Sequence, residues 1–258
     1  MTEAPDLATD DGHVLLHAPT TATLDELRAR LRASETVGVK LLAAIGGQAD
    51  SLLARLPRST RDVLEQATAR ALMLSYDLAF QSRKHGLGAG APDWMHTALT
   101  TGMGMAGGLG GLGTALAELP VTTTLLLRNV QDVAGRYGFD PQEKQTRLAC
   151  LHVLAATGPL CDRPLDQAGF LAARMTLSGA TVQGVIAKVA PRLSVVLGKK
   201  LAAQAVPVLG AAAGAATNFT YARYYRNVAH VSFGLRRLAE DSDSDYDTLL
   251  KQIQAPAG

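Results

Sequence analysis

Apolar residues recur along this chain at intervals of three and four positions, the spacing that places them on one face of an α-helix. The first such run begins near Leu24, where Thr21 or Thr23 can cap the helix. A longer run extends from about residue 59 to Lys84. We expect its buried face to consist of five apolar residues: Val63, Ala67, Ala71, Leu74 and Leu78.

The second half of the pattern predicts further helices and no strand, because the β-branched residues occur singly inside helical spacing. Pro120 is expected in the first turn of one helix, where its missing N–H is not needed, and Gly138 is expected to end it. A later long helical stretch is expected to break at Pro191 and again near Pro207.

Two stretches without charge are rich in Gly and Ala, at residues 97–117 and 201–222. Their glycines recur at steps close to four, the spacing that lets two helix backbones approach closely. We therefore predict that the two stretches pack against each other as the centre of a bundle. Two membrane-spanning helices are the alternative, which weakly hydrophobic Gly and Ala disfavour. The expected packing glycines are Gly104, Gly108, Gly111, Gly210 and Gly214.

The predicted fold class is all-α: a single multi-helix bundle with two closely packed Gly/Ala-rich central helices. An apolar fraction of 47% supports a sizeable core, and an aromatic fraction of 5% means that small and aliphatic side chains must fill it. We expect a disordered N-terminal arm at residues 1–21, a helical domain at 22–240 and an acidic C-terminal tail at 241–258.

A net charge of +2 conceals a strong asymmetry, because residues 163–237 contain ten basic residues and one acid. Such a segment suits an anionic membrane surface or a nucleic acid, or it serves solubility alone. We favour the membrane surface and expect no nucleic-acid partner. The candidate residues for binding an anionic surface are Lys199, Arg223, Arg226, Arg236 and Arg237.

Several polar residues lie in or beside the most apolar part of the chain. Charges buried there persist when they are paired, so a structural network is the favoured interpretation. A ligand pocket is the alternative, in which Glu118 or Asp132 acts as acid or base and Lys200 or Arg128 binds an anion. The members of this group are Glu118, Thr122, Arg128, Asp132, Lys200 and Asn218.

No pattern of catalytic or metal-binding residues stands out. His96, His152 and His230 share no metal-ligand spacing, and the glycines at 102–113 lack the strand and the Gly-Lys-Ser/Thr of a phosphate loop. Cys150 and Cys161 lie in no metal-type spacing either. We therefore expect no cofactor and no metal. The only catalytic candidates are Glu118, Asp132 and His152.

Three blocks in order, GGLGGLGTALAELPVTTTLLLRNVQDVAGRYGFD, TRLACLHVLA and KKLAAQAVPVLGAAAGAATNFTYARYYRNVAHVSFGLRRL, resemble the EcsC protein family over about residues 34–240. The resemblance implies an all-helical, cytoplasmic bacterial protein, and the family takes its name from a protein encoded beside an ABC transporter. It assigns no reaction and no residue role. The matching residues are Glu118, Pro120, Thr123, Arg128, Tyr137, Gly138, Lys200, Pro207, Gly210, Asn218, Phe233, Arg236 and Arg237.

Taken together, these features favour a non-enzymatic protein at the cytoplasmic face of the membrane, either lipid-binding or accessory to a transporter. Its expected partner is anionic membrane lipid or a membrane protein such as an ABC transporter. A cytoplasmic adaptor for a transporter is one alternative. A hydrolase with a carboxylate and histidine pocket is the other.

Overall fold

The computed structural model describes residues 22–34, 54, 57–84, 111–155, 181–204 and 210–255. Within these ranges the side chains of 80–84, 111–118, 200–204 and 210–217 are not described. The described residues form helices and no strand, which confirms the all-α class. The helices are α1 (Leu24–Ser34), α3 (Arg58–Lys84), α5 (Gly111–Arg136), α6 (Lys144–Val153), α8 (Val182–Gln204), α9 (Gly210–Ser242) and α10 (Tyr246–Gln254).

The helix ends follow from local sequence. Thr23 and Glu26 form a capping box at the start of α1: Glu26 N donates to Thr23 Oγ1 at 3.2 Å, and Thr23 N donates to Glu26 Oε2 at 3.0 Å. Gly138 ends α5 with φ 81°, and the next N–H, of Phe139, donates to Ala134 O at 3.1 Å. The predicted cap at Thr23 and the predicted end at Gly138 are both correct.

Two prolines lie inside helices, where the sequence pattern predicted a first turn or a break. α5 passes through Pro120, and α8 passes through Pro191. Hydroxyl groups bind the carbonyl oxygens of both prolines: Thr124 Oγ1 donates to Pro120 O at 2.7 Å, and Ser194 Oγ donates to Pro191 O at 2.8 Å. Each hydroxyl therefore adds a hydrogen bond to a proline carbonyl group inside a helix.

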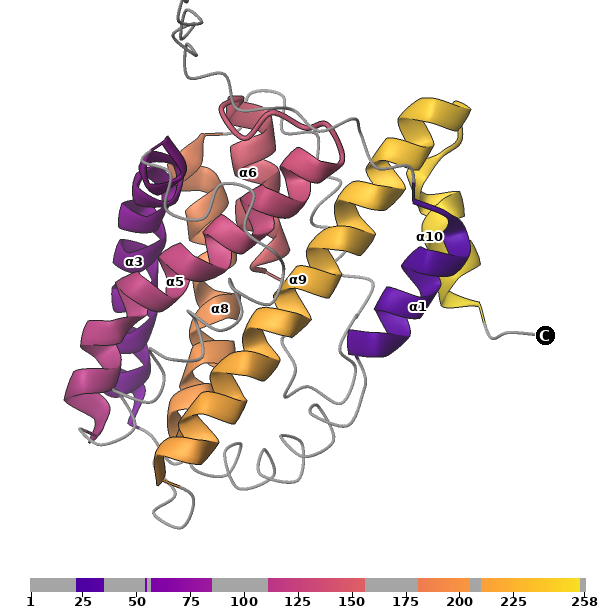
Figure 1. Cartoon of the computed structure of the whole chain (residues 1–258). Coiled ribbons are helices and arrows are strands. Elements are labelled where there is room, and N and C mark those ends of the chain that lie inside the picture. Colours follow the sequence, from indigo (N-terminus) through magenta and orange to yellow (C-terminus); the bar gives the residue numbers. More distant parts are fainter. Residues whose placement is uncertain are drawn as a thin grey trace, which may run out of the picture.

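Four long helices form the main body of the structure (Figure 1). α5 packs against α3 and α9, and α3 also packs against α8. α5 and α9 run in the same direction, whereas α8 runs opposite to α9 (Figure 1). α1 lies across the C-terminal half of α9, together with α10 (Figure 1).

The core lies around α5 and α9. α5 is buried on several sides, with Leu127, Val130 and Val133 fully enclosed. α9 contributes the largest buried side chains, among them Tyr224 and Tyr225, whose rings meet edge to face with centroids 5.2 Å apart. The few aromatic residues are therefore concentrated on one helix, and small and aliphatic side chains fill the space around them.

The buried face of α3 differs from the predicted one. Val63, Leu74 and Leu78 are exposed. The buried face is rotated about the helix axis by about 100° from the predicted face, the angle between successive residues of an α-helix. Two polar residues lie on this buried face, and their hydroxyls are hydrogen-bonded. Thr68 Oγ1 donates to Leu64 O at 2.8 Å, and Ser75 Oγ donates to Pro120 O at 3.2 Å. The buried residues of α3 are Leu64, Thr68, Ala71, Leu72, Ser75, Tyr76 and Ala79.

The segment predicted as an acidic tail, 241–258, contains a helix that packs on the bundle. α9 ends at Ser242 and is followed by Asp243 at φ 49°. Asp245 then caps α10 by accepting from Thr248 N at 3.2 Å. Arg28 of α1 donates to Gln252 O at 2.8 Å, which ties α10 to α1. The apolar face of α10 is buried through Leu249, Leu250 and Ile253.

Candidate functional site

The polar group predicted around α5 is described in part. The side chains of Glu118 and Lys200 lie outside the described residues. Arg128 and Asn218 are buried, at 8% and 3% exposure, and Asp132 is half-buried. All three engage in polar, ring or electrostatic interactions. The complete network, with half-buried Thr122 as a further member, stays a prediction.

A buried contact between α5 and α9 was missed by sequence reasoning. Tyr137 Oη lies 3.1 Å from His230 Nδ1, and the two rings meet edge to face with centroids 5.7 Å apart. Burial raises the pKa of Tyr137, so the phenol stays protonated and can act as the donor to the imidazole. In the sequence Tyr137 is one of the residues that match the EcsC pattern and His230 is a histidine without metal-ligand spacing, and neither observation links the two.

His152, the histidine among the catalytic candidates, is 3% exposed on α6. Burial lowers its pKa below 6.5, and the positive charges of Lys188 and Arg192 on α8 lower it further. His152 is therefore a neutral imidazole beside two cations. Among the described residues, no group of three or more His, Cys, Asp and Glu side chains could hold a metal ion. His96 lies outside the described residues.

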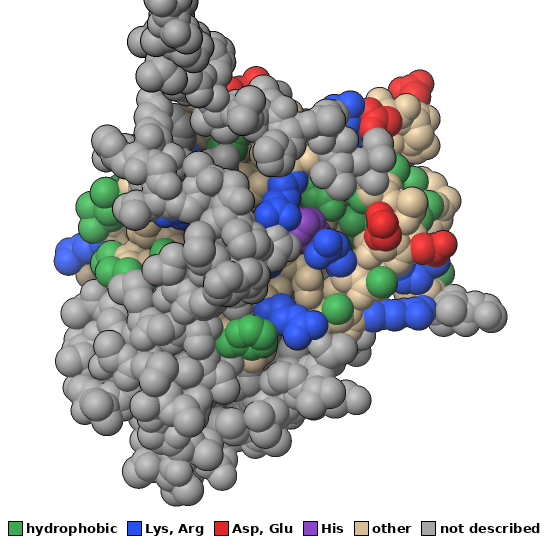
Figure 2. All heavy atoms as spheres, viewed as in Figure 1, with side chains coloured by type: hydrophobic (Ala, Val, Ile, Leu, Met, Phe, Trp, Pro, Cys, Tyr) green, Lys and Arg blue, Asp and Glu red, His purple; other side chains and the backbone are tan. Residues whose placement is uncertain are grey.

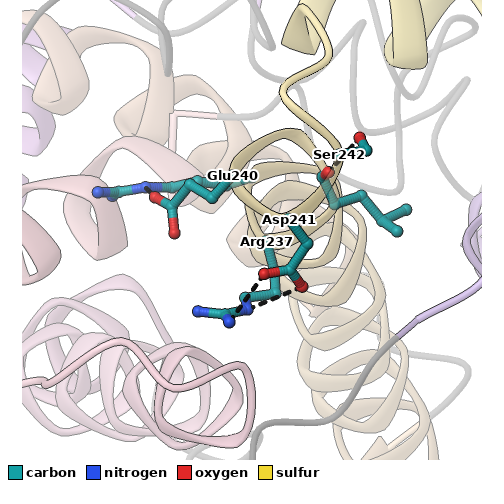
Figure 3. A network of polar contacts seen from close by, with 6 residues as sticks. Arg237, Glu240, Asp241 and Ser242 are labelled. Carbon is teal, nitrogen blue, oxygen red and sulfur yellow. Dashed lines mark hydrogen bonds and ion pairs between the residues drawn. The ribbon is translucent and has the colours of Figure 1, made fainter.

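The arginine pair at the end of α9 interacts with acids of the same helix (Figure 3). Arg236 Nε lies 3.2 Å from Glu240 Oε1, and Arg237 Nη2 lies 2.8 Å from Asp241 Oδ1. The Arg236 guanidinium also stacks on the Phe139 ring, 4.5 Å from its centroid. These two cations are thus partly neutralised, and their contribution to a basic surface is reduced.

The remaining candidates for binding an anionic surface differ in exposure. Arg226 is 6% exposed and belongs to the interior of the bundle. Arg223 is exposed on α9, and Lys199 is half-exposed on α8. Of the five predicted residues, only Arg223 and Lys199 therefore have an accessible side chain and no acidic residue four positions later in the sequence.

α8 carries a basic surface that sequence reasoning did not single out. Its 23 residues include no Asp or Glu. Four residues spaced by four, three and four positions share one face within an arc of about 60°. Three are exposed and the fourth is half-exposed. We call them the α8 stripe: Lys188, Arg192, Val195 and Lys199.

α8 and α9 form an antiparallel pair, and the exposed residues of α9 at this level lie on the side of α9 turned away from α8. Tyr221 Oη donates to Val196 O at 3.1 Å, which fixes the register of the antiparallel pair. Because α8 and α9 run in opposite directions, Phe219 lies at about the level of Lys199. Phe219 is 44% exposed, and Arg223, one turn further along α9, is exposed as well. Figure 2 shows Lys and Arg side chains at the centre of the front face, and α8 lies behind α5 in the same view (Figure 1).

Helices α5 and α8 and most of α9 lie within a segment of the sequence that matches a known protein family. The model of the EcsC protein family matches residues 89–238. The chain belongs to the EcsC protein family. It is also 30% identical over 155 residues to the protein YdbA of Bacillus subtilis (strain 168), covering 56% of this chain and 54% of YdbA. The EcsC-family chain thus spans about half the length of this curated relative. No solved structure matches the chain.

The residues that carry the EcsC resemblance are mostly buried in the described part of the chain. Tyr137, Asn218 and Phe233 are buried between the helices, and Arg236 stacks on Phe139. The α8 stripe residues Lys188 and Arg192 are not part of the quoted EcsC blocks. Lys199 begins the third quoted block, and the whole α8 stripe lies within residues 89–238, which the EcsC family model matches.

The glycine positions of this EcsC-family protein are described only in part. Gly111 begins α5, and Gly210 and Gly214 lie in the first turns of α9, while Gly104 and Gly108 lie outside the described residues. Close pairing of the two Gly/Ala-rich stretches stays a prediction. Within the described ranges, the search for a helix of sufficient length and hydropathy to cross a membrane finds none.

Proposed function

We propose that this EcsC-family protein is a non-enzymatic peripheral protein that binds anionic lipid at the cytoplasmic face of the membrane. The α8 stripe is the observation that carries the proposal. It presents three cations and one exposed valine on a single face of a helix that has no acid. A basic helix face with an apolar component is the arrangement that binds anionic membrane surfaces.

The expected strength follows from the number of cations. Each Lys or Arg near an anionic membrane surface contributes about 1 kcal/mol. The three cations of the α8 stripe would together contribute about 3 kcal/mol, roughly two powers of ten in the binding constant. This attraction is electrostatic, so it should weaken strongly as salt shortens the Debye length from about 8 Å at physiological salt to about 3 Å at 1 M.

The hydrolase alternative receives less support from the described residues. Its histidine candidate, His152, is 3% exposed, so a substrate could not reach the imidazole without a movement of the surrounding helices. A transporter-accessory role is compatible with lipid binding, because a protein held at the membrane surface is placed where it can meet a transporter.

Flotation with lipid vesicles tests the proposal. The full-length protein should float with vesicles that contain phosphatidylglycerol and should stay at the bottom with pure phosphatidylcholine. The K188E/R192E variant, which changes the net charge from +2 to −2, should bind at least about 30-fold more weakly.

A variant with the same net charge provides the control. Arg70 on α3 and Lys144 on α6 are both exposed, and R70E/K144E also changes the net charge from +2 to −2. This control should float nearly as well as the wild type. Failure of the wild-type protein to float with anionic vesicles would refute lipid binding, and equal loss in both variants would refute the role of α8.

A further inference from the structure

We propose that the protein pairs with a second copy of itself through α3, whose exposed apolar face and flanking charges are complementary to those of an antiparallel copy. The apolar face consists of four residues spaced by four, seven and four positions. We call them the α3 stripe: Val63, Ala67, Leu74 and Leu78.

The α3 stripe is a continuous apolar face on an exposed side of its helix. Val63, Leu74 and Leu78 are 53%, 55% and 47% exposed, and Ala67 is half-buried. At about 100° and 1.5 Å per residue, the four positions fall within an arc of about 60° and extend over about 22 Å. α3 lies at an edge of the bundle, where it packs on α5 and α8 (Figure 1). An apolar stripe of this length fits the apolar face of another helix.

Two opposite charges lie along one side of the α3 stripe. Arg70 and Asp77 are seven residues apart, so they project about 20° from each other on the same flank. Arg70 is exposed, and no described residue forms an ion pair with it. Asp77 Oδ1 lies 2.6 Å from Arg147 Nη2, yet the Asp77 side chain is 68% exposed. A carboxylate accepts several hydrogen bonds, so Asp77 can bind a second cation.

An antiparallel copy brings these opposite charges together. With a twofold axis between the levels of residues 73 and 74, Arg70 of each copy is level with Asp77 of the other. The same flank of both helices meets in an antiparallel pair, so both contacts form at once. A parallel copy would instead place like charges opposite each other. The charges therefore select the antiparallel arrangement.

The same register also pairs the apolar side chains. Leu74 lies next to the twofold axis and faces Leu74 of the copy, and Leu78 lies close to the small side chain of Ala67 of the copy. The apolar spacing that predicted a buried face on α3 is then explained by burial between two copies. A contact of one helix pair is at the small end of stable interfaces, so the dimer should depend on protein concentration.

The first test measures the mass of the full-length protein by sedimentation equilibrium at concentrations up to about 100 μM. The wild type should change from monomer to dimer over this range. L74A should weaken the dimer at least about tenfold, because it removes the leucine next to the axis from both copies. F219A is the matched control, because Phe219 on α9 is 44% exposed and lies outside α3. The control should dimerise as the wild type does.

The second test uses charge reversal to identify the pairing. R70D leaves two acids on the flank and D77R leaves two cations, so each variant alone places like charges opposite each other. Each should dimerise at least about tenfold more weakly than the wild type. An equimolar mixture of the two variants should restore the dimer, because opposite charges then meet at both contacts. R223D on α9 changes the net charge as R70D does and should leave the dimer unchanged.

The outcomes separate the contact from its register. A wild-type protein that stays monomeric would overturn the dimer, and this would also be the result if the α3 stripe met lipid or another protein. An L74A variant that dimerises as the wild type does would overturn the role of α3. A mixture that does not restore the dimer would overturn the pairing of Arg70 with Asp77. Circular dichroism should show an unchanged helical content in every variant, and the L74A comparison does not depend on D77R, which loses the contact with Arg147.

The dimer contact is distinct from lipid binding by the α8 stripe. Lipid binding by α8 requires only one copy, so R70E/K144E serves as the control for flotation with protein dilute enough to be monomeric. A dimer without flotation would leave this inference intact and refute lipid binding.

Discussion

The close approach of α1 to α9 provides a sharp prediction about how the bundle is held together. Gly234 lies inside α9, opposite Leu27 of α1. A Cβ atom at position 234 would lie 2.6 Å from Leu27 Cδ2 and 3.3 Å from Tyr137 Cζ. The substitution G234A therefore introduces a methyl group where the two helices leave no room for it.

Two opposing effects set the magnitude. Ala is favoured over Gly in a helix interior by about 1 kcal/mol. Overpacking of a core costs about 1–3 kcal/mol, and Leu27 cannot turn away into solvent because it is 0% exposed. G234A should thus lower the free energy of unfolding by up to about 2 kcal/mol. In an L27A background the clash with the leucine is absent, so the same substitution should raise the free energy of unfolding by about 1 kcal/mol.

The assay is urea unfolding of the wild type, the two single variants and the double variant, followed by circular dichroism at 222 nm. L27A alone should cost about 2–5 kcal/mol, because it removes a fully buried leucine. The coupling free energy between positions 27 and 234 should be about 1–3 kcal/mol. An effect of G234A that has the same sign and size in both backgrounds would refute the close packing of α1 on α9.

Three further predictions concern two buried titratable groups. Y137F removes the hydroxyl that contacts His230 and should lower the free energy of unfolding by about 1 kcal/mol, measured by urea denaturation; an unchanged value would contradict the buried hydrogen bond. His152 has a lowered pKa in the folded state, so the unfolded state binds its proton first as the pH falls. The stability that His152 contributes should therefore be present above pH 6.5 and be lost below it, by at most about 1.4 kcal/mol per pH unit. The difference between wild type and H152Q in unfolding experiments between pH 7.5 and pH 5 isolates this effect, and a difference that does not change with pH would refute it. The variant K188Q/R192Q should raise the pKa of His152, measured by NMR titration of the imidazole protons, and an unchanged pKa would show that the two cations do not act on it.

The fold class could be predicted from the sequence because helical spacing and caps are local signals. Thr23 and Glu26 are three residues apart and satisfy each other, and Gly138 adopts the positive φ that a helix end favours. Neither feature depends on distant parts of the chain. Helix boundaries of this kind can therefore be recognised before any packing is known.

The orientation of helices could not be predicted in the same way, because it depends on partners. On α3, Leu74 is exposed and Ser75 is buried, since the Ser75 hydroxyl reaches Pro120 O on α5. Pro120 itself continues a helix that its sequence predicted to begin there. These outcomes depend on contacts between segments about 45 residues apart, which apolar spacing within one segment does not contain.

The candidate surface shows the same division between local and long-range information. A count of basic residues treats Arg226 and Arg223 alike, yet Arg226 is inside the bundle and Arg223 is exposed. It also counts Arg237 in full, although Asp241 lies 2.8 Å from its guanidinium. An anionic membrane attracts only cations that it can approach within about a Debye length. Among the described residues of the basic segment, the accessible cations without an i+4 acid lie on the α8 stripe and at Arg223. Under the proposed function, charge reversal at two positions of α8 should therefore weaken binding more than the same reversal elsewhere.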